Sequence, residues 1–142
     1  MNKLRFYFLT FGAADAGLIL YGLLSLLSPN SLVETFSSSV YQFPATAVTA
    51  IAYLSALFRL LGFLNLILGI IGLILLWRFR VSPEPWLKVT VIVVAILAYL
   101  GPIIFDNTVG RIGVFELIEH ILFAGMLLSA LTMIFSRQYG SM

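Results

Sequence analysis

Four apolar stretches, each about as long as a bilayer is thick, constrain this chain more than any other feature of its sequence. They cover about residues 6–27, 58–77, 87–105 and 113–135. A helix rises about 1.5 Å per residue, so roughly 20 residues cross about 30 Å of hydrocarbon. Charged residues make up only 10% of the chain, whereas a water-facing surface usually needs about 25%. The sequence therefore predicts an all-α, polytopic membrane protein: one domain, residues 1–142, folded as a four-transmembrane-helix bundle.

The connection between the first two spans, residues 28–57, is the main irregularity. Residues 31–43 are expected to form a polar loop. Pro44 then opens a new segment, because proline suits the first turn of a helix. One helix over residues 45–77 would be about 50 Å long, far more than the bilayer needs. We therefore expect an extra outer-side helical segment before the second span, in which residues 45–57 either project outward or lie on the membrane surface.

The distribution of basic residues predicts the orientation of the bundle. Arg111 is the one basic residue in an outer loop, and Trp77 and Trp86 flank the inner loop as interfacial anchors. Positive residues favour the cytoplasmic side of a membrane. We therefore expect an integral protein of the plasma (inner) membrane with both termini in the cytoplasm. The six residues that carry this bias are Lys3, Arg5, Arg78, Arg80, Lys88 and Arg137.

Several classes of function are excluded by what the chain lacks. It has no cysteine and a single histidine, which excludes thiolate zinc sites, iron–sulfur clusters, thiol nucleophiles and a two-histidine haem site within one chain. A net charge of +2 is too small for a nucleic-acid-binding surface. We expect no cofactor and no metal. The expected partners are membrane lipids and either other membrane subunits or further copies of the chain.

Counting residues along the predicted helices places several ionisable residues at a similar depth, in the outer part of the membrane. In the structural hypothesis, Arg59 neutralises a glutamate of the fourth helix where unpaired charge is costly. In the functional hypothesis, Glu116, Glu119 and His120, which share a helix face, form an outer site for a polar head group or a proton relay. The Glu-x-x-x-His spacing is one residue longer than that of di-iron bundles. The candidate ligand-binding or ion-pair residues are Arg59, Asp106, Arg111, Glu116, Glu119 and His120.

Asp15 lies close to the membrane midplane, ten residues or about 15 Å above Arg5. Tyr99 reaches the same depth, and Asn65 lies between this level and the outer residues. An unpaired carboxylate at the midplane costs at least about 2.5–3.5 kcal/mol, so we expect a neutral Asp15 that is hydrogen-bonded to Tyr99 or to a backbone carbonyl. Asp15 serves either as an interhelical contact or as a proton-coupled or cation-binding carboxylate.

Small residues predict close packing of the first helix on the second, because they let two helix backbones approach. The first helix carries Ala13 and Gly17 on one face, and the second is punctuated by three glycines. Residues 10–80 resemble the DoxX-like group of small four-helix membrane proteins, which implies an association with membrane redox enzymes and quinone-linked complexes, often as an accessory subunit. The chain departs from that group where an acid is sought in the second helix, since it has Arg59. The features that carry the resemblance are Phe43-Pro44, then Gly62, Gly69 and Gly72, then Trp77-Arg78-Phe79-Arg80.

These observations favour an accessory or structural subunit, or an assembly factor, of a larger membrane complex, without chemistry of its own. Short loops and the absence of a nucleophile–base pair or a phosphate-binding glycine loop support this hypothesis. Two alternatives stay open. One is a small membrane protein that binds or acts on a lipid or quinone at the outer Arg59, Glu116, Glu119 and His120. The other is a homo-oligomeric proton-coupled transporter that uses Asp15.

Overall fold

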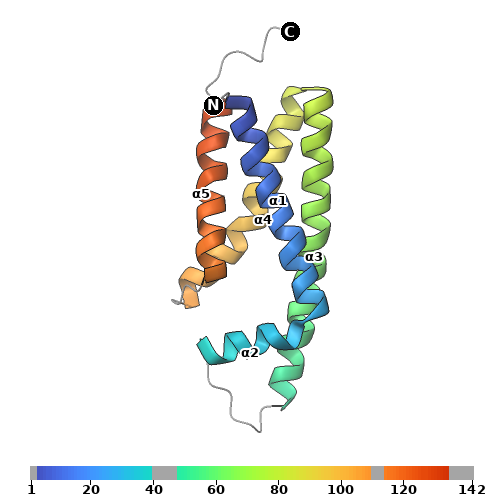
Figure 1. Cartoon of the computed structure of the whole chain (residues 1–142), viewed down its shortest axis with the longest axis vertical. Coiled ribbons are helices and arrows are strands. Elements are labelled where there is room, and N and C mark those ends of the chain that lie inside the picture. The colour runs from blue at the N-terminus through green and yellow to red at the C-terminus, as the bar shows by residue number, and fades with distance from the viewer. Residues whose placement is uncertain (1–2, 40–47, 110–113, 135–142) are drawn as a thin grey trace.

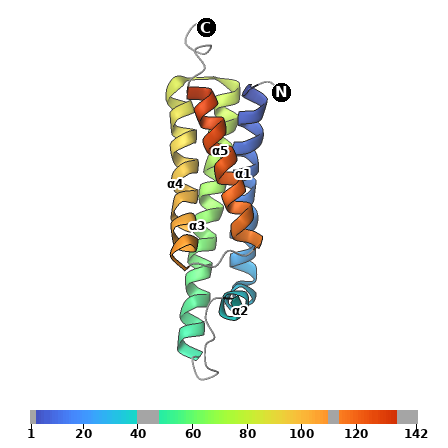
Figure 2. The same cartoon turned by 90° about the vertical axis from the view of Figure 1, so that its left-hand side faces the viewer.

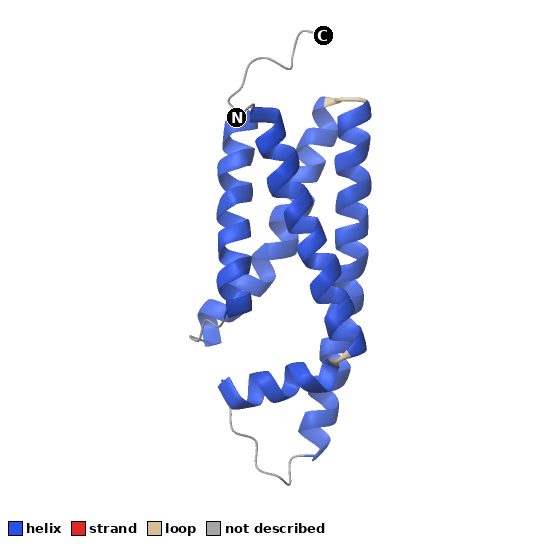
Figure 3. Cartoon of the chain, viewed as in Figure 1, coloured by secondary structure: helices blue, strands red, loops and turns tan. Residues whose placement is uncertain are grey.

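The structure is a computed structural model that describes residues 3–39, 48–109 and 114–134. These residues are almost entirely helical (Figure 3). Four of the helices, α1, α3, α4 and α5, are long and apolar enough to cross a membrane, which confirms the expected all-helical fold with four candidate membrane spans. The elements are α1 (Lys3–Leu27), α2 (Pro29–Ser39), α3 (Val48–Val81), α4 (Pro85–Val109) and α5 (Val114–Ile134).

The four long helices run along the long axis of the molecule, and α2 lies across that axis at one end (Figures 1 and 2). The first turn of α1 and the last turn of α5 lie together at the opposite end (Figure 1). We call the end of the bundle that carries α2 the α2 end, and the end that carries these two turns the termini end. Helix α1 packs on α3 and α5, and α4 packs on the same two helices from the other side. The four helices thus enclose a common interior.

Helices α1 and α3 pack closely, as their small residues predict, but they cross at Gly22 and Gly62, whereas Gly17 faces Tyr99 of α4 and Leu122 of α5. A Cβ atom added to Gly22 would lie 2.7 Å from the carbonyl oxygen of Gly62 and 2.8 Å from the amide nitrogen of Leu66. A Cβ added to Gly62 would lie 2.7 Å from the Cβ of Ser25. Only hydrogen fits at both positions, so the two backbones meet directly.

The predicted polar loop at residues 31–43 is wrong for residues 31–39, which belong to α2; residues 40–43 lie outside the described chain. Pro29 occupies the first turn of this helix, where its missing amide hydrogen costs nothing. The carbonyl oxygen of Ser28 accepts a hydrogen bond from the amide of Leu32 at 3.4 Å. Val33 is 3% exposed, so α2 forms because it buries an apolar face that its serine-rich composition obscures.

The second span continues outward as one helix, the first of the two arrangements expected for residues 45–57. Helix α3 has 34 residues, or about 51 Å at about 1.5 Å per residue. Residues 45–47 lie outside the described chain. Helix α4 is also longer than predicted and contains Pro102 without ending there, because neighbouring helices in a membrane bundle tolerate proline.

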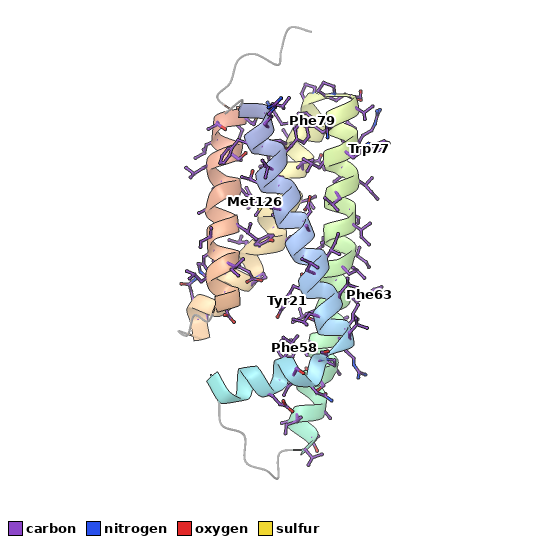
Figure 4. The ribbon with its side chains drawn as sticks, viewed as in Figure 1. Tyr21, Phe58, Phe63, Trp77, Phe79 and Met126 are labelled. Carbon is purple, nitrogen blue, oxygen red and sulfur yellow. The ribbon has the colours of Figure 1, made fainter. Side chains whose placement is uncertain are left out.

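The most tightly packed part of the core lies towards the termini end. The ring centroids of Tyr7 and Phe11 are 4.5 Å apart, and those of Tyr7 and Phe79 are 5.8 Å apart. Phe79 and Met126 lie in this half of the bundle, whereas Phe58 lies near α2 (Figure 4). The bundle is therefore closed by aromatic and aliphatic side chains at the end that holds the termini.

Candidate functional site

Asp15 lies in the seam between α1 and α3 and is 3% exposed. Its carboxyl group sits over Gly72: a Cβ added to that glycine would lie 2.5 Å from Cγ and 2.8 Å from Oδ2 of Asp15. One turn earlier, a Cβ added to Gly69 would lie 2.7 Å from the carbonyl oxygen of Asp15. The two glycines therefore provide the space that this acid occupies. The sequence pattern predicts only a packing role for these two glycines.

Tyr99 reaches the level of Asp15, as predicted, but its hydroxyl binds elsewhere. The hydroxyl donates a 2.7 Å hydrogen bond to the carbonyl oxygen of Ala14. Tyr99 approaches α1 from α4 over Gly17, where an added Cβ would lie 3.2 Å from the tyrosine oxygen. The Asp15 carboxyl faces α3 instead. Tyr99 meets α1 at Ala14 and Gly17, whereas Asp15 points from another side of α1 towards α3, which explains why the expected bond from Asp15 to Tyr99 is not observed.

Three buried polar atoms in the described interior have no hydrogen-bond partner: Asp15 Oδ2, Tyr7 Oη and Ser129 Oγ. Tyr7 is not among the residues predicted from the sequence, because a tyrosine in an apolar run resembles any other core aromatic. The feature that could have identified Tyr7 is its hydroxyl group, because phenylalanine would suffice for packing alone. Tyr7 also lies two turns before the buried Asp15.

His120 joins α5 to α4 near the α2 end. Its Nδ1 lies 2.7 Å from the carbonyl oxygen of Glu116, and its Nε2 lies 3.2 Å from Nδ2 of Asn107. With the proton on Nδ1, the ring donates to Glu116 and accepts from Asn107, so both nitrogens are used. Asn107 also donates to the carbonyl oxygen of Ile103 at 2.7 Å. Asn107 is not among the residues predicted from the sequence; the feature that could have identified it is an amide five residues after Pro102, at the end of an apolar helix.

The structure does not bring Arg59 together with the glutamates of α5. Arg59 is exposed on α3. Glu116 and Glu119 are on α5, which lies on the far side of α1 from α3 (Figure 1). Arg78 and Glu84 form an ion pair at the other end of α3, with nitrogen and oxygen 3.6 Å apart. Arg59 and the α5 glutamates are predicted to lie at a similar depth in the membrane, but the order of the helices around the bundle separates them.

The remaining candidates are placed only in part. Asn65 is half-buried on α3, and Glu119 is half-buried on α5. Asp106 belongs to α4, but its side chain is not described, and Arg111 lies outside the described residues. Among the residues that are described, no group of three or more histidines, aspartates or glutamates could hold a metal ion.

Comparisons with known proteins give no relative: no family model, no curated protein and no solved structure matches the chain. The bundle contains two polar groups at different levels along its long axis. One is the buried Asp15, and the other is the His120–Asn107 pair between α4 and α5. Tyr99 joins α4 to α1 next to Asp15, because its hydroxyl donates to the carbonyl oxygen of Ala14.

Proposed function

We propose that this chain is an integral membrane accessory or structural subunit, or an assembly factor, of a larger membrane complex, without chemistry of its own. In this proposal it lies in the plasma (inner) membrane with both termini in the cytoplasm. The observation that carries it is the first part of α3, residues 48–57, which we call the overhang. The resemblance to DoxX-like accessory subunits, expected from the sequence, points in the same direction.

The overhang extends beyond the hydrocarbon of the bilayer. Trp77, 65% exposed, and the arginines after it mark one membrane interface of α3. About 30 Å of hydrocarbon above Trp77 takes up roughly 20 residues and ends near Leu57. The turns beyond this point still expose apolar side chains, since Val48 is 69% and Tyr53 is 70% exposed. Lipid tails do not cover them there, so another protein surface is their most favourable partner.

The overhang is held in place by α2. The hydroxyl of Ser55 donates a 2.9 Å hydrogen bond to Oδ1 of Asn30, and α2 packs on α3. A surface that is fixed before binding loses less conformational entropy when a partner docks. The occupant we propose is an apolar surface of another membrane protein at the outer membrane interface.

Site-specific photocrosslinking in native membranes tests this proposal. A photoreactive phenylalanine derivative replaces Tyr53 in one variant. In the control it replaces Leu97, which is 64% exposed on α4 within the membrane. We expect position 53 to give one discrete protein adduct and position 97 to give mainly lipid adducts. Native mass spectrometry of the extracted wild type should show the same partner at a fixed ratio.

A pair of substitutions makes the test specific. Tyr53→Ser should release the partner while the bundle stays folded, whereas Leu97→Ser should leave the complex intact. Adducts of position 53 with lipid alone, together with a monomeric native mass, would exclude the accessory function. A mass that contains only copies of this chain would favour the homo-oligomeric alternative instead.

A further inference from the structure

The contact between His120 and Asn107 is part of a continuous chain of hydrogen bonds that joins α5 to α4. The side-chain amide of Asn107 donates to the carbonyl oxygen of Ile103 at 2.7 Å and lies 3.2 Å from Nε2 of His120. Nδ1 of the ring lies 2.7 Å from the carbonyl oxygen of Glu116. Each of these three bonds has one donor and one acceptor only when the imidazole is neutral and carries its proton on Nδ1.

A second proton on the imidazole is incompatible with this chain of bonds. A cationic histidine carries a hydrogen on both nitrogens, so Nε2 would point its hydrogen at the amide nitrogen of Asn107, which is also a donor. Turning the amide over would bring Oδ1 to the ring, but it would also place that oxygen against the carbonyl oxygen of Ile103. At least one of the two bonds made by Asn107 is therefore lost when His120 is protonated.

The last turns of α4 follow a hinge. Pro102 lies inside the helix and has no amide hydrogen, so one backbone bond of the helix is missing there. Gly101 is exposed, and nothing lies within 4 Å of a Cβ atom added to it. Helices bend most readily at such residues. Residues 103–109, which include Asn107, can therefore move relative to the rest of α4 without unfolding it.

The His120–Asn107 contact lies at the edge of the membrane. Trp86, 57% exposed, marks the interface at the opposite end of α4, and about 30 Å of hydrocarbon beyond it takes up roughly 20 residues. Asn107 is exposed and follows the part of α4 that is apolar enough to span a membrane, Pro85–Ile104. Protons from water therefore reach this contact directly.

The other titratable and charged groups around the ring come from three parts of the chain. Glu116 and Glu119 are half-buried on α5 itself. On α4 and the connection after it, the charged residues are Asp106 and Arg111, and neither side chain is described. Helix α1 also packs on α5 and has Tyr21 as the one titratable residue among its last ten. Substitution of the histidine alone separates its effect from theirs.

We propose that Asn107 and His120 form a pH-sensitive latch at the α2 end of the bundle. The latch is closed when the imidazole is neutral, and protonation opens it by releasing residues 103–109 from α5. In the opening step, a hydronium ion transfers its proton to Nε2, which leaves water and an imidazolium ion; a rise in pH reverses the step. This device goes beyond an accessory function and does not depend on it.

Nitrogen-15 NMR of the purified full chain in lipid bilayers tests whether the latch binds a proton. The chain contains a single histidine, so labelled histidine reports on His120 alone. An imidazole in water gains its proton between about pH 5 and 8. We expect the neutral ring with its proton on Nδ1 at pH 8 and the imidazolium ion at pH 5.

Distances between pairs of spin labels test whether the latch opens. The chain has no cysteine, so Thr108→Cys on α4 and Leu117→Cys on α5 place one label on each side of the latch. Leu97→Cys and Leu128→Cys lie on the same two helices, on the termini side of the hinge, and form the matched control pair. For the first pair we expect one distance at pH 8 and a longer distance that predominates at pH 5, whereas the control distance should stay constant.

Two substitutions make the test specific to the proposed chain of bonds. His120→Gln lacks the titrating ring and should give the same label distance at both pH values. Asn107→Asp offers a carboxylate that accepts a hydrogen bond from the imidazolium ion, so this variant should keep the short distance at pH 5.

Each other outcome overturns the proposal. A ring that stays neutral at pH 5 would mean that the latch binds no proton there. A protonated ring with an unchanged label distance would mean that the latch does not open. An equal change in the control pair would show a general loosening of the bundle instead of movement at the hinge. A response that persists in His120→Gln would assign the pH dependence to a neighbouring group.

Discussion

At the scale of single residues, glycine decides where α1 and α3 meet and where Asp15 can lie. At Gly22 the neighbouring atoms are backbone, and at Gly62 they are backbone atoms and the Cβ of Ser25, so a methyl group has no room unless a whole helix moves. At Gly72 the neighbouring atoms belong to the Asp15 side chain, which can rotate. At Gly101 nothing lies within 4 Å of an added Cβ. Replacing each of these glycines by alanine should therefore change the stability of the bundle to a different extent.

We predict this order for the free energy of unfolding. Gly22→Ala should destabilise the bundle by about 1–3 kcal/mol or more, as overpacking does. Gly72→Ala should cost less and should displace the Asp15 carboxyl. Gly101→Ala should be neutral or stabilising by up to about 1 kcal/mol, because alanine favours helix. Reversible unfolding in mixed micelles measures all three. A Gly22→Ala variant as stable as Gly101→Ala would contradict the observed seam.

At the scale of elements, α2 shows how a helix forms from a segment with little apolar content. Its sequence contains four serines and one threonine, which alone suggest a loop. Burial of Val33 and the Asn30–Ser55 hydrogen bond supply the tertiary contacts that a helix of 11 residues requires, since short helices are marginal in isolation. The Asn30–Ser55 hydrogen bond between α2 and α3, which we call the brace, therefore contributes to the folding of α2.

A double-mutant cycle measures this brace. Asn30→Ala and Ser55→Ala should each lower the protection of α2 amides from hydrogen exchange, and the double variant should add little to either. The expected coupling is about 0.5–1.5 kcal/mol, the usual net value of one hydrogen bond. Thr90→Ala is the control, because the Thr90 hydroxyl bonds within α4 to the carbonyl of Trp86. Additive effects of the two substitutions would show that the residues do not interact.

At the scale of the whole molecule, all four long helices follow one axis, and both described chain ends lie at the termini end (Figure 1). That arrangement predicts that the first turn of α1 and the last turn of α5 share one side of the membrane. The arginines and tryptophans near the short α3–α4 connection lie at this same end, where positive residues favour the cytoplasm. The predicted orientation in the membrane therefore depends on how all four long helices are arranged.

The absence of cysteine makes the orientation directly measurable. A single cysteine at the exposed Glu34 of α2 should react with a membrane-impermeant maleimide in intact cells. A single cysteine at Val81, 61% exposed at the end of α3, should react only after the membrane is permeabilised. The opposite pattern would reverse the proposed orientation, and equal labelling before permeabilisation would contradict a membrane-spanning arrangement.

The sequence alone determined the four long helices and the close contact of the first two. Both follow from local physics, because an apolar run of that length must satisfy its backbone within a helix, and glycines admit another backbone wherever they occur. The tertiary structure decided which side chains meet. Depth along a helix follows from counting residues. The direction of a side chain around the axis and the order of helices in the bundle depend on contacts between distant segments. This is why Tyr99 bonds to Ala14, Arg59 lies apart from the α5 glutamates, and residues 31–39 form a helix.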